Sequence, residues 1–212
     1  MSPSPLLFLD SDLFVLHAGA GLLPALIQAT GSNLNRARRL HPLPYMLQKG
    51  ALAARYPQGL RERAAAWCSR ITAVEDAPSP GSLEPLLGVA AIEPGEALLF
   101  ALAAETPRSL MATGDRRACC ALAAASGLAE IRALLRHKLI CLESALALLL
   151  REVGFPHLAA ALTLVRDYNQ TLRVLLPQGE LTDEGAFREG LASYLRDVSA
   201  LTGDLLLPVT VE

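Results

Sequence analysis

Acidic side chains follow three segments of the sequence that have the character of buried strands. Asp10 comes directly after the apolar residues 6–9, and Asp115 and Glu143 follow apolar runs further along the chain. Glu96 stands in the first turn of a predicted helix. The carboxyl ends of parallel strands meet at one edge of a sheet, where ligands bind in open α/β folds. The spacing therefore predicts that these carboxylates converge on one site.

Carboxylates that lie close together repel one another, and their pKa values rise unless a cation sits among them. The four cysteines include no CxxC pair, and few of the four histidines lie near them, so the predicted ligands are oxygen atoms. Mg²⁺ or Mn²⁺ is the natural cation for such a site. A pair of these ions can activate water and stabilise the leaving oxygen of a phosphodiester. The acids therefore indicate metal-dependent hydrolysis of a phosphate ester.

Each acid also has a purely structural interpretation. Asp10 or Asp12 could simply cap the first helix, and Glu96 could serve only the helix dipole. Asp115 could cap the helix that follows it, and Glu143 could be a surface acid at the end of a strand. Several caps aligned on one sheet edge are a rarer coincidence than any single one, which favours a functional cluster.

Alternating apolar runs and helical patterns predict an α/β fold with a mainly parallel central sheet flanked by helices. The predicted strands cover residues 6–9, 71–74, 109–113 and 138–142, and the clearest predicted helices cover residues 13–29, 97–105, 116–126 and 144–153. Residues 36–70 are predicted to be helical in pieces, and residues 77–82 to form a loop.

From Phe155 onward the apolar residues keep helical spacing on two faces. We therefore expect residues 1–154 to form the domain that carries the site and residues 155–212 to form an all-helical C-terminal extension. This extension is expected to pack on the core, or to complete a homodimer, rather than to fold as a separate domain.

The chain has 212 residues, of which 52% are hydrophobic, yet no segment is predicted to span a membrane. Its longest uncharged stretch, residues 13–35, contains His17, Pro24 and several glycines, which is typical of a core helix. No basic segment precedes this stretch, and Asp10 and Asp12 occupy the place where a signal peptide carries positive charge. Together with cysteines that are expected to be buried and reduced, these features indicate a cytoplasmic protein.

Positive charge is concentrated between residues 36 and 63, where seven basic side chains accompany one acid. A basic segment beside an acidic site is what a ligand with a phosphate backbone requires, although a solvated helical face explains the charge equally well. Tyr45 and Tyr56 could stack on bases or serve only as structural aromatics. The candidate nucleic-acid-binding residues are Arg36, Arg38, Arg39, Arg55, Arg116 and Arg117.

Three segments resemble motifs of the PIN-domain nucleases. Residues 6–12, with the sequence LLFLDSD, resemble the opening strand of that family, an apolar run followed by Asp, Thr or Ser, and Asn. Residues 94–97, PGEA, are similar to its acidic helix start. Residues 109–117, SLMATGDRR, are similar to its strand followed by Thr-x-Asp and a basic residue. The resemblance covers roughly residues 5–153.

The resemblance implies a PIN-like fold and a ribonuclease that cleaves RNA, preferably single-stranded, with Mg²⁺ or Mn²⁺. Asp12 stands where the family commonly has Asn, so Asp12 and Glu143 are candidates for further metal ligands. The family usually adds an acid from the helices after the first strand, where this sequence offers only Glu62 in surroundings that do not match. The implied site comprises the catalytic metal ligands Asp10, Glu96 and Asp115 and the supporting hydroxyls of Ser11 and Thr113.

Two other functions fit parts of the pattern. Residues 10–12 match the Asp-x-Asp opening of haloacid dehalogenase-like phosphohydrolases, in which Asp10 would be the nucleophile and Asp12 the acid and base. Those enzymes also need a lysine and a late acidic pair, but the only lysines are Lys49 and Lys138 and no Asp-Asp pair follows. In the other alternative, a degenerate nuclease fold serves as a scaffold that binds RNA, or a protein partner or inhibitor through the apolar tail.

Overall fold

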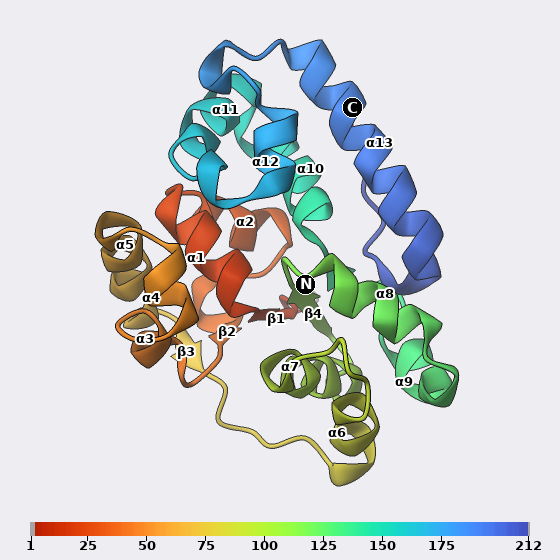
Figure 1. Ribbon diagram of the computed structural model, residues 1–212. Coiled ribbons are helices and arrows are strands. Elements are labelled where there is room, and N and C mark those ends of the chain that lie inside the picture. Colours follow the sequence, from red (N-terminus) through yellow and green to blue (C-terminus); the bar gives the residue numbers. More distant parts are fainter. Residues whose placement is uncertain (1–2, 212) are drawn as a thin grey trace.

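The computed structural model describes residues 3–211 and is built around one five-stranded sheet with all strands parallel (Figure 1). Residues 1–2 and 212, the outer ends of the two expected domains, lie outside the described residues. The order of the strands across the sheet is β3-β2-β1-β4-β5, which places β1 at the centre. The strands are β1 (Leu6–Leu9), β2 (Ala37–Arg39), β3 (Thr72–Ala73), β4 (Ser109–Ala112) and β5 (Leu139–Ile140).

Helices cover both faces of this sheet because its central strands are apolar on both sides. Leu7 and Leu9 belong to one buried cluster, whereas Phe8 belongs to a second cluster on the opposite face, as the alternation of side chains along a strand requires. The first cluster includes α1 (Ser11–Gly19), α2 (Leu23–Ala29), α5 (Gln58–Cys68) and α10 (Leu142–Val153). The second includes α6 (Pro80–Leu87), α7 (Pro94–Glu105), α8 (Arg116–Ala124) and α9 (Ala129–Leu134).

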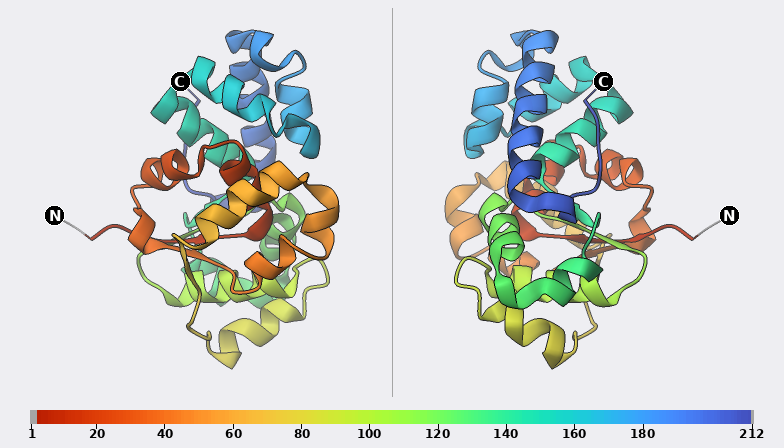
Figure 2. Two further views of the ribbon diagram at one scale, coloured as in Figure 1. Left: turned by 90° about the vertical axis from the view of Figure 1, so that its left-hand side faces the viewer. Right: turned by 90° about the vertical axis from the view of Figure 1, so that its right-hand side faces the viewer.

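The later part of the chain is helical up to Leu205 and then extended. It contains α11 (Phe155–Thr163), α12 (Gln170–Leu175) and α13 (Glu184–Thr202), and α13 packs against α8 and α10. Figure 2 shows α13 running along one side of the molecule, with the chain returning beside it after residue 205. In this return, Leu206 bridges to Leu139, and the amide of Leu207 donates to the Leu139 carbonyl oxygen at 2.7 Å. Leu206 and Leu207 therefore lie at the outer edge of β5.

The predicted α/β class and the parallel central sheet are confirmed. Strands form within or at the expected segments 6–9, 109–113 and 138–142, and the edge strand β3 lies inside residues 71–74. The short helices α3 (Leu43–Met46) and α4 (Ala51–Arg55), followed by α5, match the expectation of helical pieces. Pro94 in the first turn of α7 suits its position because the first amides of a helix lack intrahelical partners.

The main error concerns residues 37–39, which were expected to be helical but form β2. This strand pairs with β1 on one side and with β3 on the other, so backbone hydrogen bonds to distant segments determine its conformation. The arginines of β2 also find acceptors on the main chain: Arg39 Nε donates to the Cys68 carbonyl oxygen at 3.0 Å. Local sequence alone carries little of this information.

Two further differences concern helix boundaries. The expected single helix over residues 13–29 is two helices, α1 and α2, related by a bend of 117°. Gly21, between them, has a φ of +76°, a left-handed conformation that glycine adopts without strain. The expected loop at residues 77–82 instead leads into α6, which starts at Pro80.

Among residues 3–211, no single helix is long and apolar enough to cross a membrane. Only α1 and α2 taken together, despite their bend, reach the length and apolar content of a span.

Candidate functional site

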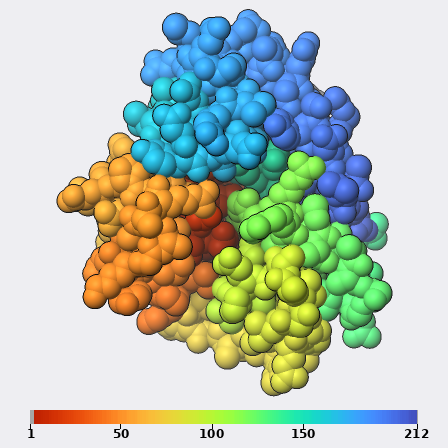
Figure 3. Space-filling model, in the orientation of Figure 1, coloured from red at the N-terminus to blue at the C-terminus, as the bar shows by residue number. Residues whose placement is uncertain are grey.

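The carboxyl edge of the sheet opens into a cavity of about 590 Å³. Its lining includes Asp10 after β1, Glu96 in the first turn of α7, and Asp115 at the start of α8. Figure 3 shows the hollow in the face of the molecule, with N-terminal residues (red) at its base and later segments around it. The parallel topology thus brings the three acids predicted as catalytic ligands to one cavity.

Asp10 is positioned by the sheet itself. Leu9 pairs with Ala112 of β4, and the amide of Asp10 donates to the Ala112 carbonyl oxygen at 2.9 Å. The side chain is only 9% exposed, and burial, together with the charges of Asp12 and Asp115, raises its pKa to about 7. Among the described residues it makes no side-chain capping hydrogen bond to α1. Hydrogen bonds from the Ser11 and Asp12 amides, in the first turn of α1, act to lower the pKa of Asp10 but do not outweigh burial.

Glu96 is the second buried acid of the cavity and is 5% exposed. Burial, followed by the charge of Asp10, raises the pKa of Glu96 to about 8. Its Oε2 atom accepts a hydrogen bond from the backbone amide of Glu93 at 3.2 Å, which fixes the side chain at the start of α7. Like Asp10, it forms no ion pair with a described residue. The cavity therefore holds two buried carboxyl groups that have no ion-pair partner among residues 3–211.

Asp115 has a structural role, as Glu96 also does in the capping box that it forms with Glu93 at the start of α7. Its Oδ1 atom accepts hydrogen bonds from the amides of Arg117 at 2.7 Å and Ala118 at 3.2 Å, so it caps α8. Its Oδ2 atom also pairs with the Arg117 guanidinium at 3.0 Å. Burial acts to raise the pKa of Asp115, but the hydrogen bonds from Arg117 and Ala118 outweigh it and leave the pKa lowered. Asp115 thus lines the cavity as a carboxylate that is already paired.

The two predicted supporting hydroxyls differ in their contacts. Thr113, fully buried after β4, donates from Oγ1 to Glu96 Oε1 at 3.3 Å and accepts from the amide of Asp115 at 3.0 Å. It therefore fixes two acids relative to each other. Ser11 is 5% exposed and lines the cavity, and its Oγ atom has no hydrogen-bond partner among the described residues. Ser11 thus offers a free hydroxyl beside Asp10.

The two additional acids proposed as metal ligands differ in their relation to the cavity. Asp12 lines the rim of the cavity and forms an ion pair with Arg55, which also donates to the Tyr168 carbonyl oxygen at 3.2 Å. Glu143 is buried in the first turn of α10, where its carboxylate lies beside the thiol of Cys141 and outside the cavity. The structure therefore does not bring Glu143 into the cluster.

Of the six arginines predicted to bind nucleic acid, Arg55 and Arg117 line the cavity. Arg38 donates to the carbonyl oxygens of Asn35 and Ala37, and Arg39 donates to those of Cys68 and Leu40. These two side chains therefore stabilise the loops around β2. Arg36 precedes β2, away from the carboxyl edge of the sheet, and Arg116 lies outside the cavity at the start of α8.

Sequence reasoning missed two parts of the cavity. Glu93, which precedes Pro94 at the start of α7, is a further acid of the cavity lining. In the sequence, its position directly before a first-turn proline could have indicated that it lies at a helix start, on the same edge of the sheet as the other acids. The apolar side chains of Leu40, Pro42, Met46 and Leu52 also line it. Their meeting with the acids depends on how the chain folds back after β2, for which the sequence has no local signal.

Among residues 3–211, no group of three or more His, Cys, Asp or Glu side chains is arranged to hold a metal ion. Mg²⁺, however, is commonly bound through one or two carboxylates and keeps several waters. Asp10 and Glu96 provide two buried carboxyl groups, and Ser11 provides a free hydroxyl. This donor set fits a hydrated Mg²⁺ or Mn²⁺, and Asp115 can join it only if Arg117 releases its carboxylate.

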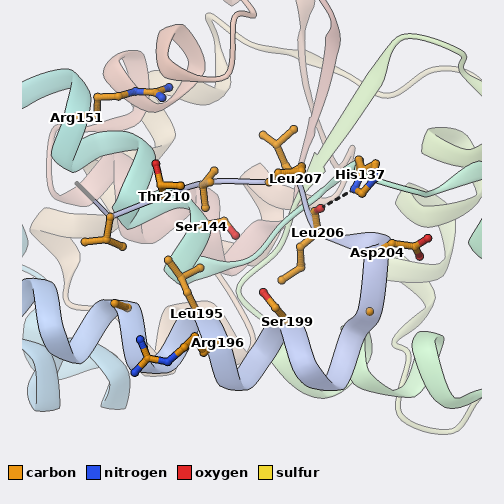
Figure 4. A pocket seen from close by; sticks show the side chains of 15 residues that line it. His137, Ser144, Arg151, Leu195, Arg196, Ser199, Asp204, Leu206, Leu207 and Thr210 are labelled. Carbon is orange, nitrogen blue, oxygen red and sulfur yellow. Dashed lines mark hydrogen bonds between the residues drawn. The ribbon is translucent and has the colours of Figure 1, made fainter.

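A second hollow of about 690 Å³ lies between α13 and residues 206–211 (Figure 4). His137 Nδ1 lies 3.3 Å from the Leu206 carbonyl oxygen at one end of it, and Arg151 lies at the other end (Figure 4). Asp204, on its rim, pairs with Arg136. None of the site residues predicted from the sequence lines this hollow.

Neither a protein-family model, nor a curated protein, nor a solved structure matches the chain significantly.

The cysteines of the chain form no disulfide bonds among the described residues. Cys68, Cys119 and Cys141 are buried, Cys120 is half-buried, and all four are free thiols.

Proposed function

We propose that this protein is a PIN-like, metal-dependent endoribonuclease that hydrolyses single-stranded RNA. The observation that carries the proposal is the pair of buried carboxyl groups, Asp10 and Glu96, with pKa values raised to about 7 and about 8 beside an open cavity. Buried acids of this kind cost stability when they ionise, and a bound divalent cation removes that cost. Arg55 and Arg117, which pair with Asp12 and Asp115, are the cationic side chains of the cavity lining and would contact a phosphate backbone.

In this proposal each residue of the cavity has a defined role. Asp10 and Glu96 hold the cation, and Thr113 keeps Glu96 and Asp115 in fixed relative positions. A bound Mg²⁺ or Mn²⁺ supplies Lewis-acid activation of water and stabilisation of the leaving oxygen. Hydrolysis forms a bond between the water oxygen and phosphorus and breaks the bond from phosphorus to the leaving ribose oxygen, which takes up a proton. Arg55 and Arg117 would hold the non-bridging phosphate oxygens.

The proposal also covers the organisation of the chain. Residues 1–154 would form the PIN-like nuclease unit, and residues 155–212 would form a helical C-terminal extension packed on it. The packing of α13 against α8 and α10 supports this assignment. Arg55 adds a second link, since it joins Asp12 at the site to the Tyr168 carbonyl oxygen of the later helices.

The direct test is cleavage of a single-stranded oligoribonucleotide with Mg²⁺ or Mn²⁺. Asp10→Asn and Glu96→Gln should each lower the rate by about 100-fold or more, because removing one group that stabilises transition-state charge has effects of that size. Glu130→Gln, which changes an exposed acid on α9, is the matched control and should cleave like the wild type. Equal rates for all four proteins would reject the proposal.

The alternative of a phosphohydrolase with Asp10 as nucleophile has less support. Lys138 precedes β5, and its Nζ atom donates to the carbonyl oxygens of Ala103 and Thr106, at the C-terminal end of α7. The described cavity lining around Asp10 contains no lysine, and Asp12 is paired with Arg55. Trapping of a phosphoryl group on Asp10 would favour this alternative over the nuclease.

The non-enzymatic alternative is a PIN-like scaffold without metal chemistry. In such a scaffold Asp10 and Glu96 would bind and release protons but would not bind Mg²⁺ or Mn²⁺. The proposed nuclease would bind these cations at the same two residues. Calorimetric titration with millimolar Mn²⁺ distinguishes the two. Heat of binding that disappears in Glu96→Gln supports the nuclease, whereas a folded protein that binds no Mn²⁺ supports the scaffold.

A further inference from the structure

The cavity beside Asp10 has an apolar wall that metal chemistry does not use. Leu40 follows β2, Pro42 and Met46 belong to the turn into α3 and to α3 itself, and Leu52 lies in α4. We call these four side chains the apolar wall. In Figure 3 the segment that carries them (orange) forms one side of the hollow, and Leu98 of α7 also lines the cavity.

The charged groups come from other elements. Asp10 and Ser11 follow β1, Glu96 belongs to α7 and Asp115 caps α8. The cavity therefore combines a polar part, which would hold a cation and a phosphate, with an apolar part formed by residues 40–52. Leu40 and Leu52 are largely buried, so the exposed Pro42 and the half-buried Met46 contribute most of the apolar surface that a ligand would remove from water.

We propose that the apolar wall receives one unstacked base of a single-stranded RNA, next to the phosphate that is cleaved. This inference rests on the proposed nuclease function and names the part of the substrate that the site holds. A nucleotide carries a flat, weakly polar base and a charged phosphate, which match the two parts of the cavity. A volume of about 590 Å³ suits one nucleotide rather than a duplex, because small-ligand pockets span roughly 300–1,000 Å³.

The chemistry of the wall also predicts how selective the site is. Aliphatic side chains and the thioether of Met46 contact any base through its face and read no hydrogen-bonding edge. The base must leave its stack to enter, and this costs least in a strand that is already single. Cleavage should therefore need a base at the position beside the cut, tolerate all four bases there, and be slow on duplex RNA.

The experiment compares oligoribonucleotides that differ by one abasic residue. Each position around the cut is made abasic in turn, and kcat/KM is measured with Mn²⁺ for the full chain. An abasic residue directly beside the cut should lower kcat/KM about tenfold, which corresponds to about 1.4 kcal/mol, because the apolar surface buried by the base is then left in water. Abasic residues further away should have little effect. Equal kcat/KM for all positions, or equal rates on single strands and duplexes, would overturn the proposal.

Adjacent residues of α3 supply a matched pair of variants. Met46 is half-buried and lines the cavity, whereas Tyr45 is 63% exposed and lies outside it. Met46→Ala should reduce the penalty of the abasic residue, because the contact is already lost, and Met46→Leu should restore it. Tyr45→Ala should behave like the wild type. If Tyr45→Ala removes the penalty and Met46→Ala does not, the base lies elsewhere and the proposal is wrong.

Binding measurements test the proposed base site independently of the proposed nuclease activity. Fluorescence anisotropy of a labelled single strand is recorded with Glu96→Gln, so that no cleavage is required. Tighter binding of the intact strand than of the abasic strand, lost in Met46→Ala, supports the base site even if wild type cleaves nothing. Cleavage of both strands at the same rate keeps the nuclease and rejects the base site. Absence of both cleavage and differential binding rejects both.

Discussion

Asp10 and Glu96 are carboxyl groups that the folded chain keeps partly protonated near neutral pH. Their pKa values of about 7 and about 8 result mainly from burial, and the charge of Asp10 further raises the pKa of Glu96. Asp115, at the same cavity, has a lowered pKa because Arg117 and the amides of α8 stabilise its charge. The three acids therefore differ in charge state, although they have the same functional group.

The raised pKa values predict a particular dependence of stability on pH. At Asp10 and Glu96 the folded protein binds more protons than the unfolded chain between about pH 4 and pH 8, so these two groups lower the free energy of unfolding as pH rises through this range. His17, whose pKa burial lowers to about 4, acts in the opposite direction below about pH 6.5. Glu96→Gln removes one of the two groups and should be more stable than the wild type at pH 8.5, by on the order of 3 kcal/mol. At pH 4 the two proteins should be nearly equal.

Urea denaturation at both pH values measures this difference, with Glu130→Gln as the control for loss of an exposed charge. Mn²⁺ should raise the stability of the wild type at pH 8.5 and leave Glu96→Gln nearly unchanged, since a ligand stabilises only the state that binds it. A wild type and a Glu96→Gln variant with the same pH dependence would contradict the assigned burial of this acid.

At the scale of the elements, the sequence predicted strands best where a run is apolar on both faces. Residues 6–9 and 109–112 have that character because β1 and β4 lie at the centre of the sheet. The strand β2 is Ala-Arg-Arg, and only its pairing with β1 and β3 makes it a strand. Hydrogen bonds between segments that are distant in sequence are invisible to local patterns, which explains the error.

Thr113 connects three elements, and this connection can be tested. Its hydroxyl joins β4 to Glu96 of α7 and to the Asp115 amide at the start of α8. Thr113→Val keeps the shape but leaves the Asp115 amide without its acceptor, which should cost about 1–3 kcal/mol of unfolding free energy. Thermal or urea denaturation measures the loss, and Thr113→Ser should retain most of the stability. Equal losses in the two variants would assign the effect to packing instead of hydrogen bonding.

Substitution of Lys138, which binds the C-terminal end of α7, distinguishes the proposed nuclease from the alternative phosphohydrolase. Its ammonium group donates to two carbonyl oxygens at the C-terminal end of that helix, at 2.8 and 2.9 Å. Lys138→Met should lower the unfolding free energy by about 1–2 kcal/mol, because it removes hydrogen bonds from a charged donor, and should leave RNA cleavage by the folded protein unchanged. Loss of activity without loss of fold would instead favour a phosphohydrolase that uses this lysine.

At the scale of the whole molecule, the sequence placed Asp10, Glu96 and Asp115 at one edge of the sheet, but it wrongly added Glu143, missed Glu93 and did not predict what surrounds these acids. The meeting of Asp10, Glu96 and Asp115 follows from the parallel topology alone, since all three lie at carboxyl ends of strands or at helix starts on that edge. The ion pair between Asp12 and Arg55 and the apolar wall depend on how residues 40–55 fold over the site. Such contacts across the chain follow from packing, which no local pattern encodes.

The return of the chain along β5 predicts a difference between two adjacent leucines. Leu206 is buried against β5, whereas Leu207 is half-buried in the hollow beside α13. Leu206→Ala should cost about 2–5 kcal/mol of unfolding free energy, as for other buried leucines, and Leu207→Ala clearly less. Urea denaturation measures both. Equal costs would contradict the packing of Leu206 on the edge of the sheet.

The position of Leu206 and Leu207 on β5 also has a consequence during protein synthesis. Leu206 is made roughly 70 residues after Leu139, the residue to which it bridges. At translation rates of about 5–20 residues per second, β5 therefore waits about 3–14 s for the segment that covers its outer edge. During this interval the nascent chain presents an unpaired strand to other chains. The newly made protein, rather than the finished one, should thus be the form most dependent on chaperones.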